Sequence, residues 1–485
     1  MIALITALQH LLGPEHVLTS DSPGADLSAW EQDWRQRARG KALAVLRPGN
    51  TAEVAGVVQL CAAQGTAIVP QGGNTGLVVG SIPDHSGTQV VLSLTRMNQV
   101  RELDTHTQTL TAEAGCTLAH LQEVAAQAGW LFPLSLASEG SCTMGGNLAT
   151  NAGGPQVLRY GNARDLCLGL EVVTAQGQIW HGLSGLRKDN TGYDLRHLMI
   201  GSEGTLGIIT AATFKLFPPP AARLTAWAAV PDLSAAVRLL GMAQRQLGAG
   251  LTGFEVMSQF SLSLVAKHLP QLQIPLYEKS PWGVLLELSD GESEAHALQQ
   301  LEALLEAALL GELIRDAVVA QNLTQAQALW QVRESISMAQ AKEGLNIKHD
   351  ISLPISRIPD FVAETDTLLQ NRFPGVRLVN FGHLGDGNLH YNVQAPLGVD
   401  SQNFLHQRES EINTLVFNQV QKYKGSISAE HGIGLLKAQV LPNYKDPTAV
   451  YMMRAIKQAL DPLNIFNPGK VIIETSAWKP KHPSP

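Results

Sequence analysis

The sequence predicts an α+β protein built from two domains, and three observations support this. Its 485 residues, 45% of them apolar, are enough for more than one hydrophobic core. Segments typical of strands alternate with segments typical of helices, and a triple proline at 218–220 interrupts them. More than half of the 44 glycines precede that triplet. We therefore predict a first domain over 1–220, a second over 221–424 and a motif-rich C-terminal segment over 425–485.

The composition argues against several classes of protein. Charged residues make up 16% of the chain and the formal net charge is −7, so nucleic acid is not an expected partner. No stretch reaches the roughly 18 uninterrupted apolar residues of a membrane-spanning helix, and residues 1–18 lack a signal-peptide pattern. We therefore expect a cytoplasmic location and no integral membrane segment. The four cysteines lack zinc-type spacing and are expected to be reduced and buried: Cys61, Cys116, Cys142 and Cys167.

The first domain is expected to begin with a short apolar strand over 42–46. A helix follows, because Asn50 and Glu53 form a capping-box pattern and Gly65 is a suitable stop. The next strand covers 66–69 and runs directly into a glycine-rich loop. Further strand segments are expected around 90–94 and 100–114, and a helix over 117–128.

The second domain is expected to combine strands such as 282–288 with helices such as 293–310. The apolar spacing of that helix assigns a core face to Leu298, Leu301, Leu304 and Leu305. Residues 376–383 and 388–393 should pair as a hairpin, because the Asp-Gly between them is typical of a tight turn.

Three glycine-rich loops carry the first functional signal, over 71–81, 140–154 and 201–207. Successive N–H groups of such loops can turn inward and bind an anion such as a diphosphate, although tight turns alone also explain single Gly-Gly pairs. The chain has neither a G-x-G-x-x-G turn that opens a helix nor a G-x-x-x-x-G-K-[ST] loop. A Rossmann dehydrogenase and a P-loop nucleotidase are therefore disfavoured.

These loops, with Lys188-Asp-Asn-Thr-Gly-Tyr193, resemble the FAD-binding domain of the vanillyl-alcohol oxidase/p-cresol methylhydroxylase superfamily. The resemblance covers nearly the whole chain and is closest to the branch of D-2-hydroxyglutarate dehydrogenases, D-lactate dehydrogenases and the glycolate oxidase flavoprotein subunit. It implies a two-part FAD-binding domain of the p-cresol methylhydroxylase type, an α+β substrate (cap) domain with an antiparallel sheet, and a C-terminal segment that packs at the flavin and metal site.

The resemblance also implies which residues bind FAD. They are Gln71, Gly72, Gly73, Asn74, Thr75, Gly76, Gly80, Ser81, Gly140, Ser141, Gly145, Gly146, Asn147, Thr150, Asn151, Gly153, Glu203, Gly204, Gly207, Ile208 and Asn467. Some members of the superfamily attach FAD to a histidine in the first loop. This chain has Asn74-Thr75 there, so the FAD is expected to be non-covalent.

Two histidines, His383 and His390, flank the predicted hairpin turn, and the later segment 428–434 supplies Glu430 and His431. Two imidazoles and a carboxylate suit Zn²⁺, Fe²⁺ or Mn²⁺, although the spacing alone equally allows structural histidines. The resemblance implies that His383, His390 and Glu430 bind a divalent metal, with zinc the first choice, and that His431 is the general base. If this segment is extended, Glu430 and His431 point to opposite sides, so one can reach the metal while the other reaches the substrate.

A cationic anchor is expected upstream of the hairpin. Residues 330–337 look helical, which would place Arg333 and Ser337 on one face, and Lys348 follows in a predicted strand over 345–353. Such groups can hold a carboxylate, although ordinary solvated charges give the same pattern. The resemblance places substrate contacts at Arg333, Ser337 and Lys348, and also at Asn392.

Together these features predict an FAD-dependent dehydrogenase that oxidises a D-2-hydroxy acid to the 2-oxo acid by metal-assisted proton abstraction and hydride transfer to flavin N5. D-2-hydroxyglutarate is the first choice of substrate, with malate or lactate weaker. The alternatives are a D-lactate or glycolate dehydrogenase or oxidase, and a non-catalytic flavoprotein subunit of a larger complex. The expected partners are the acid and an electron acceptor such as an electron-transfer flavoprotein or a quinone; a homodimer is left open.

Overall fold

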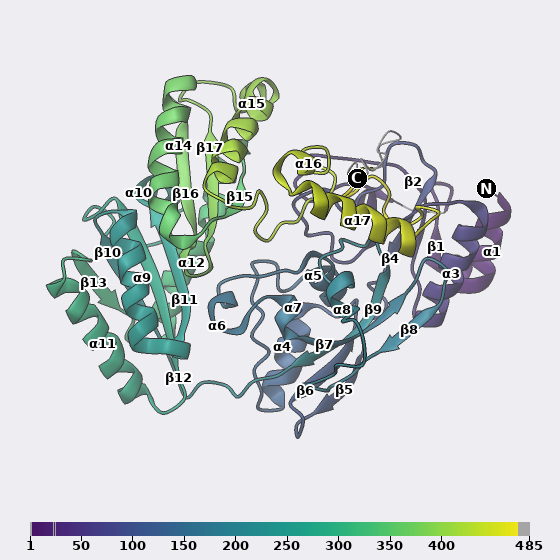
Figure 1. Ribbon diagram of the computed structural model, residues 1–485, viewed down its shortest axis with the longest axis horizontal. Helices are drawn as coiled ribbons and strands as arrows, with labels where there is room; N and C mark the ends of the chain where they lie inside the picture. The colour runs from purple at the N-terminus through teal and green to yellow at the C-terminus, as the bar shows by residue number, and fades with distance from the viewer. Residues whose placement is uncertain (1, 23, 25, 474–485) are drawn as a thin grey trace, which may run out of the picture.

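Three β-sheets arranged in two α+β halves make up the computed structural model, which describes residues 2–22, 24 and 26–473. Figure 1 shows the N-terminal half on the right, the second half on the left, and the C-terminal helices above the junction between them. The expected α+β class is confirmed, including the antiparallel sheet of the second half.

The N-terminal half contains two of the sheets. The first is formed by β1 (Val17–Leu18), β2 (Ala42–Leu46), β3 (Ile68–Gln71) and β4 (Gln89–Ser93). Their order is β1-β2-β4-β3, and β4 pairs in parallel with both of its neighbours. The second sheet is formed by β5 (Val100–Asp104), β6 (Thr109–Glu113), β7 (Cys167–Val173), β8 (Ile179–Gly182) and β9 (Ile208–Lys215). It is antiparallel and has the order β5-β6-β9-β7-β8.

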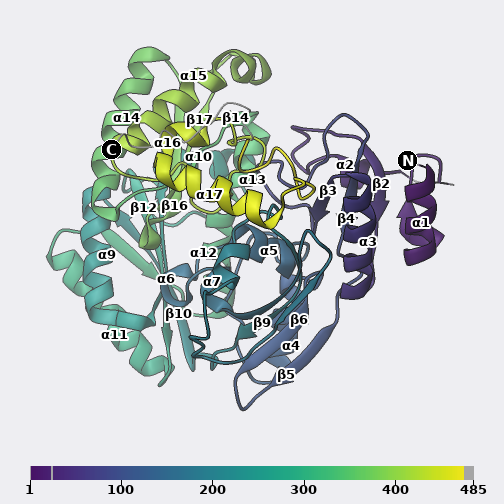
Figure 2. The ribbon, with the colours of Figure 1, turned by 45° about the vertical axis from the view of Figure 1, so that its right-hand side comes forward.

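The helices of this half follow local sequence signals. They are α1 (Ile2–Leu12), α2 (Ser28–Glu31), α3 (Thr51–Gln64), α4 (Leu118–Gln127), α5 (Met144–Thr150), α6 (Val157–Tyr160), α7 (Ala163–Leu166) and α8 (Arg196–Met199). At the start of α3 the Asn50 side chain accepts the Glu53 N–H at 2.9 Å, and the left-handed Gly65 ends the helix. Both signals were expected. Figure 2 shows α1 and α3 side by side against the first sheet.

The second half is built on one antiparallel sheet. Its strands are β10 (Ala222–Val230), β11 (Leu251–Ser258), β12 (Trp282–Asp290), β13 (Asp316–Val319), β14 (Asn346–Ile347), β15 (Asp350–Ser352), β16 (Arg377–His383) and β17 (Asn388–Gln394). The order is β13-β10-β12-β11-β16-β17-β14, with β15 also paired to β17. The predicted hairpin is β16 and β17, joined by a 3₁₀ turn over Leu384–Asp386 and a left-handed Gly387.

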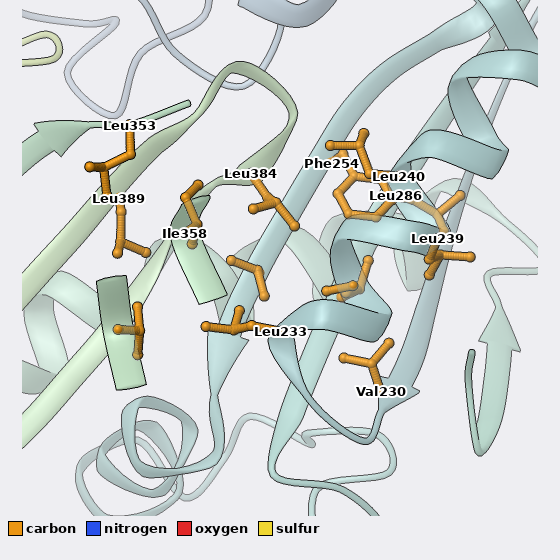
Figure 3. Packing of buried hydrophobic residues seen from close by; sticks show 14 of the residues in the cluster. Val230, Leu233, Leu239, Leu240, Phe254, Leu286, Leu353, Ile358, Leu384 and Leu389 are labelled. Atoms are coloured by element: carbon orange, nitrogen blue, oxygen red, sulfur yellow. The ribbon is translucent and has the colours of Figure 1, made fainter. Parts of the chain in front are cut away.

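Helices cover both faces of this sheet. They are α9 (Leu233–Leu247), α10 (Gln259–His268), α11 (Glu294–Leu310), α12 (Leu323–Glu334), α13 (Ile336–Glu343), α14 (Ile358–Arg372) and α15 (Ser401–Lys422). Leu239, Phe254 and Leu286 belong to the core beneath α9, which Figure 3 shows. On the opposite face Trp227 and Met257 pack with residues of α10 and α12. Successive residues of a strand point to opposite sides, so the consecutive apolar residues of these strands supply the cores on both faces of the sheet.

The C-terminal segment contacts both halves. Ser426 pairs with Ser352 in the second half, whereas Phe466 pairs with Ile68 of β3. Between these two points lie α16 (Leu441–Tyr444) and α17 (Pro447–Leu460), which Figure 1 draws in yellow above the junction. Residues 474–485 of the predicted C-terminal segment lie outside the described part of the chain.

Several expectations about elements were wrong in detail. Leu298 was assigned to the core face of α11, but its side chain is 36% exposed, because the buried stripe begins elsewhere on the helix. The single helix expected over 330–337 is divided at Ser335 into α12 and α13. The strand expected over 345–353 is divided into β14 and β15, with Lys348 between them. The strand expected at 66–69 begins two residues later, at Ile68.

Candidate functional site

The three glycine-rich loops surround one pocket, here called the glycine-loop pocket. It is lined by Pro70, Gln71, Gly72, Gly73, Asn74, Thr75, Gly76, Val78, Gly80, Ser81, Leu94, Ala114, Thr143, Gly145, Gly146, Asn147, Ala149, Thr150, Ser202, Glu203, Gly204, Gly207, Ile208, Ile209 and His431. The Thr143 hydroxyl is buried here and has no hydrogen-bond partner in the described protein. A polar ligand that accepts or donates a hydrogen bond therefore fits this lining.

Most of the residues expected to bind FAD line the glycine-loop pocket, but five do not: Gly140, Ser141, Asn151, Gly153 and Asn467. Two of these five brace the loops instead. The Ser141 carbonyl lies so close to Gly73 that any side chain at Gly73 would collide with it. The Asn467 amide donates to the carbonyls of Gly80 and Glu203 at 2.8 and 2.9 Å, which joins two of the loops.

Side chains of the first loop also hold the loop itself. The Asn74 amide donates to the carbonyls of Ala29 and Gln32, at 3.2 and 2.9 Å, and its oxygen accepts the Ser81 hydroxyl at 2.9 Å. Asn74 also adopts a left-handed backbone conformation with φ 53°. The polar side chains of Asn74 and Ser81 thus help to fix the shape of the loop that lines the pocket.

A cluster of titratable groups adjoins this pocket. The Nε2 atoms of His390 and His431 lie 3.7 and 3.8 Å from the Glu430 carboxylate, and their Nδ1 atoms each lie 3.8 Å from the Asp350 carboxylate. The two rings are stacked, with centroids 6.0 Å apart. One potential metal-binding atom from each of these four residues falls within 4.8 Å of the others. His383 does not belong to this group, although its ring centroid lies 5.6 Å from that of His390.

Asp350 holds the backbone of this cluster. One oxygen of its carboxylate accepts the N–H groups of Ala429, Glu430 and His431 at 2.9–3.1 Å, and the other accepts the Asn388 amide at 2.8 Å. These four donors occupy the acceptor positions of a carboxylate, so Asp350 is suited to support the site rather than to bind a metal. The three converging N–H groups curl the backbone. The segment is therefore not extended, and the side chains of Glu430 and His431 converge instead of pointing to opposite sides.

A second carboxylate holds the following residues. The Glu203 side chain accepts the N–H groups of Ile433 and Gly434, both at 2.7 Å. Gly432 lies between the two carboxylates with φ 83°, and a side chain there would collide with Glu203. Segment 429–434 is thus fastened by Asp350 from the second half and by Glu203 from a loop of the N-terminal half.

His383 is oriented by a buried ion-pair chain. Its Nδ1 lies 2.6 Å from one Glu255 oxygen, and the other oxygen accepts the Arg333 Nε–H at 2.7 Å. Glu255 of β11 lies directly opposite His383 of β16, so the sheet register creates this contact. A hydrogen bond at Nδ1 leaves Nε2 of His383 as the nitrogen that could bind a metal. Arg333 is buried, and its Nη2 has no partner in the described protein.

The electrostatics of the cluster favour a cation. Burial, with the nearby carboxylates of Asp350 and Asp386, raises the pKa of Glu430 to about 8. Burial lowers the pKa of His431 to about 4, against the opposing effect of Asp350, and also lowers that of His390. The neutral imidazoles of His390 and His431 thus lie beside the Glu430 carboxyl group, and imidazole and carboxylate donors suit a divalent metal.

The residues predicted to contact the substrate differ in their burial and in their partners within the protein. Ser337 is exposed, whereas Arg333 is buried. Lys348 is half-buried, and burial followed by the charge of Arg35 lowers its pKa to about 8. The Asn392 oxygen accepts the His349 N–H and its amide donates to Gln340, both at 3.1 Å, so this side chain is engaged within the protein.

Sequence reasoning missed the supporting carboxylates Glu255 and Asp350, and it assigned Glu203 to FAD binding rather than to the support of segment 429–434. Glu255 stands within an apolar stretch, and this was the available signal, because a buried acid requires partners. All four cysteines are buried and unpaired, as expected. No helix within the described ranges is both long and apolar enough to cross a bilayer.

The comparisons with known proteins agree with this geometry. The chain matches the family model of an FAD binding domain over residues 42–182 and that of the C-terminal domain of FAD linked oxidases over 219–471. It is 38% identical over 469 residues to the mitochondrial D-2-hydroxyglutarate dehydrogenase of Arabidopsis thaliana, covering 96% of this chain and 81% of that protein. The chain belongs to the D-2-hydroxyglutarate dehydrogenase branch of the FAD-linked oxidases.

Two further comparisons extend this assignment. A D-2-hydroxyglutarate dehydrogenase of Xanthomonas citri pv. viticola is 39% identical over 449 residues, which cover 92% of this chain and 93% of that one. The crystal structure of p-cresol methylhydroxylase with substrate bound has a TM-score of 0.75 at 17% identity, covering 97% and 96% of the two chains, so it shares the fold. As a member of this branch, the protein is an FAD-dependent oxidoreductase that acts on hydroxy acids.

Proposed function

We propose that this dehydrogenase oxidises a D-2-hydroxy dicarboxylic acid, with D-2-hydroxyglutarate first, by means of non-covalent FAD and a divalent metal, with zinc first and manganese or iron as alternatives. The observation that carries the proposal is the position of His431, which lines the glycine-loop pocket and also lies 3.8 Å from Glu430. A substrate held there would touch the flavin side and the metal side together. The names of the two relatives support the choice of acid.

His383, His390 and Glu430 would hold the metal, and Asp350 would support them from behind. When bound, the metal lowers the pKa of the substrate hydroxyl and FAD accepts the hydride from the adjacent carbon. His431 can accept the hydroxyl proton because its lowered pKa keeps the imidazole neutral near pH 7. The Asp350 carboxylate, 3.8 Å from Nδ1, then stabilises the imidazolium. The electrons would pass to an acceptor such as an electron-transfer flavoprotein or a quinone.

Anaerobic flavin reduction tests this proposal directly. Addition of D-2-hydroxyglutarate should bleach the flavin band near about 450 nm, and the L enantiomer is the matched control. Chelator treatment should abolish the bleaching, and added Zn²⁺, Mn²⁺ or Co²⁺ should restore it. Full reduction by metal-free protein would rule out the metal, and bleaching by no 2-hydroxy acid would rule out the function.

A further inference from the structure

One buried aromatic residue, Phe381 of β16, adjoins the proposed site without contributing a polar group to it. Its side chain is 2% exposed. Phe381 lies directly opposite His390 on β17 and two residues before His383, so these three side chains leave the sheet on the same face. Glu255 of β11 belongs to this face as well, because it lies opposite His383. The Phe381 ring is thus surrounded by groups that the site uses.

The Phe381 ring lies against the guanidinium group of Arg333. The Cζ atom of Arg333 is placed over the ring, 5.0 Å from its centroid. This separation is within the roughly 6 Å at which the negative face of an aromatic ring attracts a cation. Both side chains are buried, so water and salt screen the attraction less than they would at an exposed site.

Two contacts together fix the plane of this guanidinium. Phe381 lies against its face, whereas Glu255 accepts the Nε–H group on one edge at 2.7 Å. On the remaining edge, the Nη2 atom of Arg333 is buried and has no hydrogen-bond partner among the described residues. A buried donor without a partner costs free energy, and an incoming acceptor removes that cost. The remaining edge of Arg333 is therefore suited to bind a carboxylate.

The same ring connects Arg333 to the histidines of the site. The ring centroids of Phe381 and His390 lie 4.9 Å apart, and the two planes form an angle of 44°. The His390 ring in turn stacks on that of His431, at 6.0 Å, and His431 lines the glycine-loop pocket. Arg333, Phe381, His390 and His431 thus form a continuous row that ends at this pocket. Phe381 fixes the spacing between the guanidinium and the first imidazole of the row.

We propose that Phe381 is a positioning residue that orients the Arg333 guanidinium for the second carboxylate of a dicarboxylic 2-hydroxy acid. Phe381 acts through the face of its ring and does not contact the substrate. In the proposed function the hydroxyl end of the acid lies at His390, Glu430 and His431, which leaves Arg333 for the far carboxylate. This inference rests on the proposed function and adds a physical origin for its preference for a dicarboxylate.

Fluorinated phenylalanine in place of Phe381 separates the charge distribution of the ring from its shape. Each fluorine withdraws electrons from the ring face and weakens its attraction for a cation, whereas the size of the ring changes little. Mono-, di- and trifluorinated holoenzymes are compared on D-2-hydroxyglutarate and on D-2-hydroxyvalerate, which lacks the second carboxylate. KM for D-2-hydroxyglutarate should rise stepwise, by about 3- to 30-fold with the trifluorinated ring, while kcat stays within about threefold. For D-2-hydroxyvalerate, kcat/KM should change by less than about threefold.

Two controls make this result specific to the guanidinium. The same fluorinated series in place of Phe361, a fully buried ring of α14 that lies 5.5 Å from the ring of Tyr391, should leave KM for both acids unchanged. In Arg333→Met the series at Phe381 should be flat, because the ring then has no cation to orient. Binding of 2-oxoglutarate, measured by calorimetry, should weaken along the series at Phe381 by the same factor as KM rises.

The outcomes separate this inference from the proposed function. If the wild-type enzyme oxidises D-2-hydroxyglutarate and fluorination of Phe381 leaves KM unchanged, only the role of Phe381 is refuted. Equal losses on both acids also refute that role, since a general disturbance of the site would act on every substrate. A series that is equally steep in Arg333→Met refutes action through the guanidinium. If the wild-type enzyme oxidises no 2-hydroxy acid, the proposed function itself fails and this inference fails with it.

Discussion

The adjacent residues Glu430 and His431 have the same neighbours but are suited to different roles, metal binding and proton acceptance. Both lie against Asp350 and His390, yet only His431 also lines the glycine-loop pocket. A carboxylate compensates the charge of a metal dication, whereas a neutral imidazole can accept a proton. The two roles therefore differ because only the His431 side chain reaches the glycine-loop pocket. They do not depend on two side chains that point to opposite sides of a strand.

This division predicts different losses for two substitutions. Glu430→Gln should lower both the bound metal and the activity, because it removes the only anionic member of the proposed ligand set. His431→Asn should keep metal and FAD but slow flavin reduction by roughly 10²-fold or more. Metal analysis combined with anaerobic stopped-flow absorbance measures both effects. Loss of metal in His431→Asn, with metal retained in Glu430→Gln, would reverse the assignment.

A second residue-scale prediction concerns Arg333, whose Nε–H donates to the buried Glu255. Arg333→Ala removes one of the two cationic partners of that carboxylate and leaves His383 as the other, so the free energy of unfolding should fall by about 1.5–3 kcal/mol. His383, which Glu255 orients, should then bind metal more weakly. Urea unfolding and metal titration measure the two effects. Ser337→Ala is the control: its side chain is exposed and the change should stay within about 0.5 kcal/mol. An unaltered stability in Arg333→Ala would contradict this account.

At the scale of elements, local sequence signals predicted the helix ends and the hairpin turn. The contacts between residues far apart in the sequence were not predicted. The cap at Asn50, the stop at Gly65 and the hairpin turn before Gly387 each depend on a few neighbouring residues, and all three are present. The supports of the site depend on pairing between strands. Glu255 meets His383 only through the register of β11 and β16, and no spacing in the sequence records that register.

Three elements of the cap meet at one carboxylate, Glu343 at the end of α13. It accepts Lys267 and His268 of α10 at 2.6 Å each, and Arg377 of β16 at 2.5 Å. Burial opposes its ionisation, but these partners lower its pKa to about 2. A carboxylate with a lowered pKa in the folded state stabilises the fold above its unfolded pKa and loses this effect as the pH falls.

Glu343→Gln should therefore destabilise the cap by on the order of 2–3 kcal/mol at pH 7, and the difference from wild type should shrink as the pH falls from about 4.5 towards 2. Denaturant unfolding at a series of pH values measures this. Glu294→Gln, on the exposed surface of α11, is a control without these partners. A deficit that stays constant down to pH 2 would show that charge is not the cause.

At the scale of the whole molecule, the flavin is expected to be held by shape and by backbone contacts. Of the described residues that line the glycine-loop pocket, His431 is the single histidine, and none is a cysteine or tyrosine. Cys142 is buried with its sulfur accepting the Asn147 amide at 3.4 Å. Acid precipitation should therefore leave the yellow colour in the supernatant. A yellow pellet would establish a covalent link.

The two-sided fastening of segment 429–434 gives the enzyme a preferred order of assembly. Glu203 fixes the segment only when its own loop is in place, and that loop lines the glycine-loop pocket. Loading of FAD should therefore tighten metal binding, and by reciprocity the metal should slow the release of FAD, each by roughly 5- to 100-fold. Metal titration of deflavinated and reconstituted protein measures the first factor, and Glu203→Gln should reduce it. By the same coupling, a chain that meets the metal before FAD is expected to retain that metal less well.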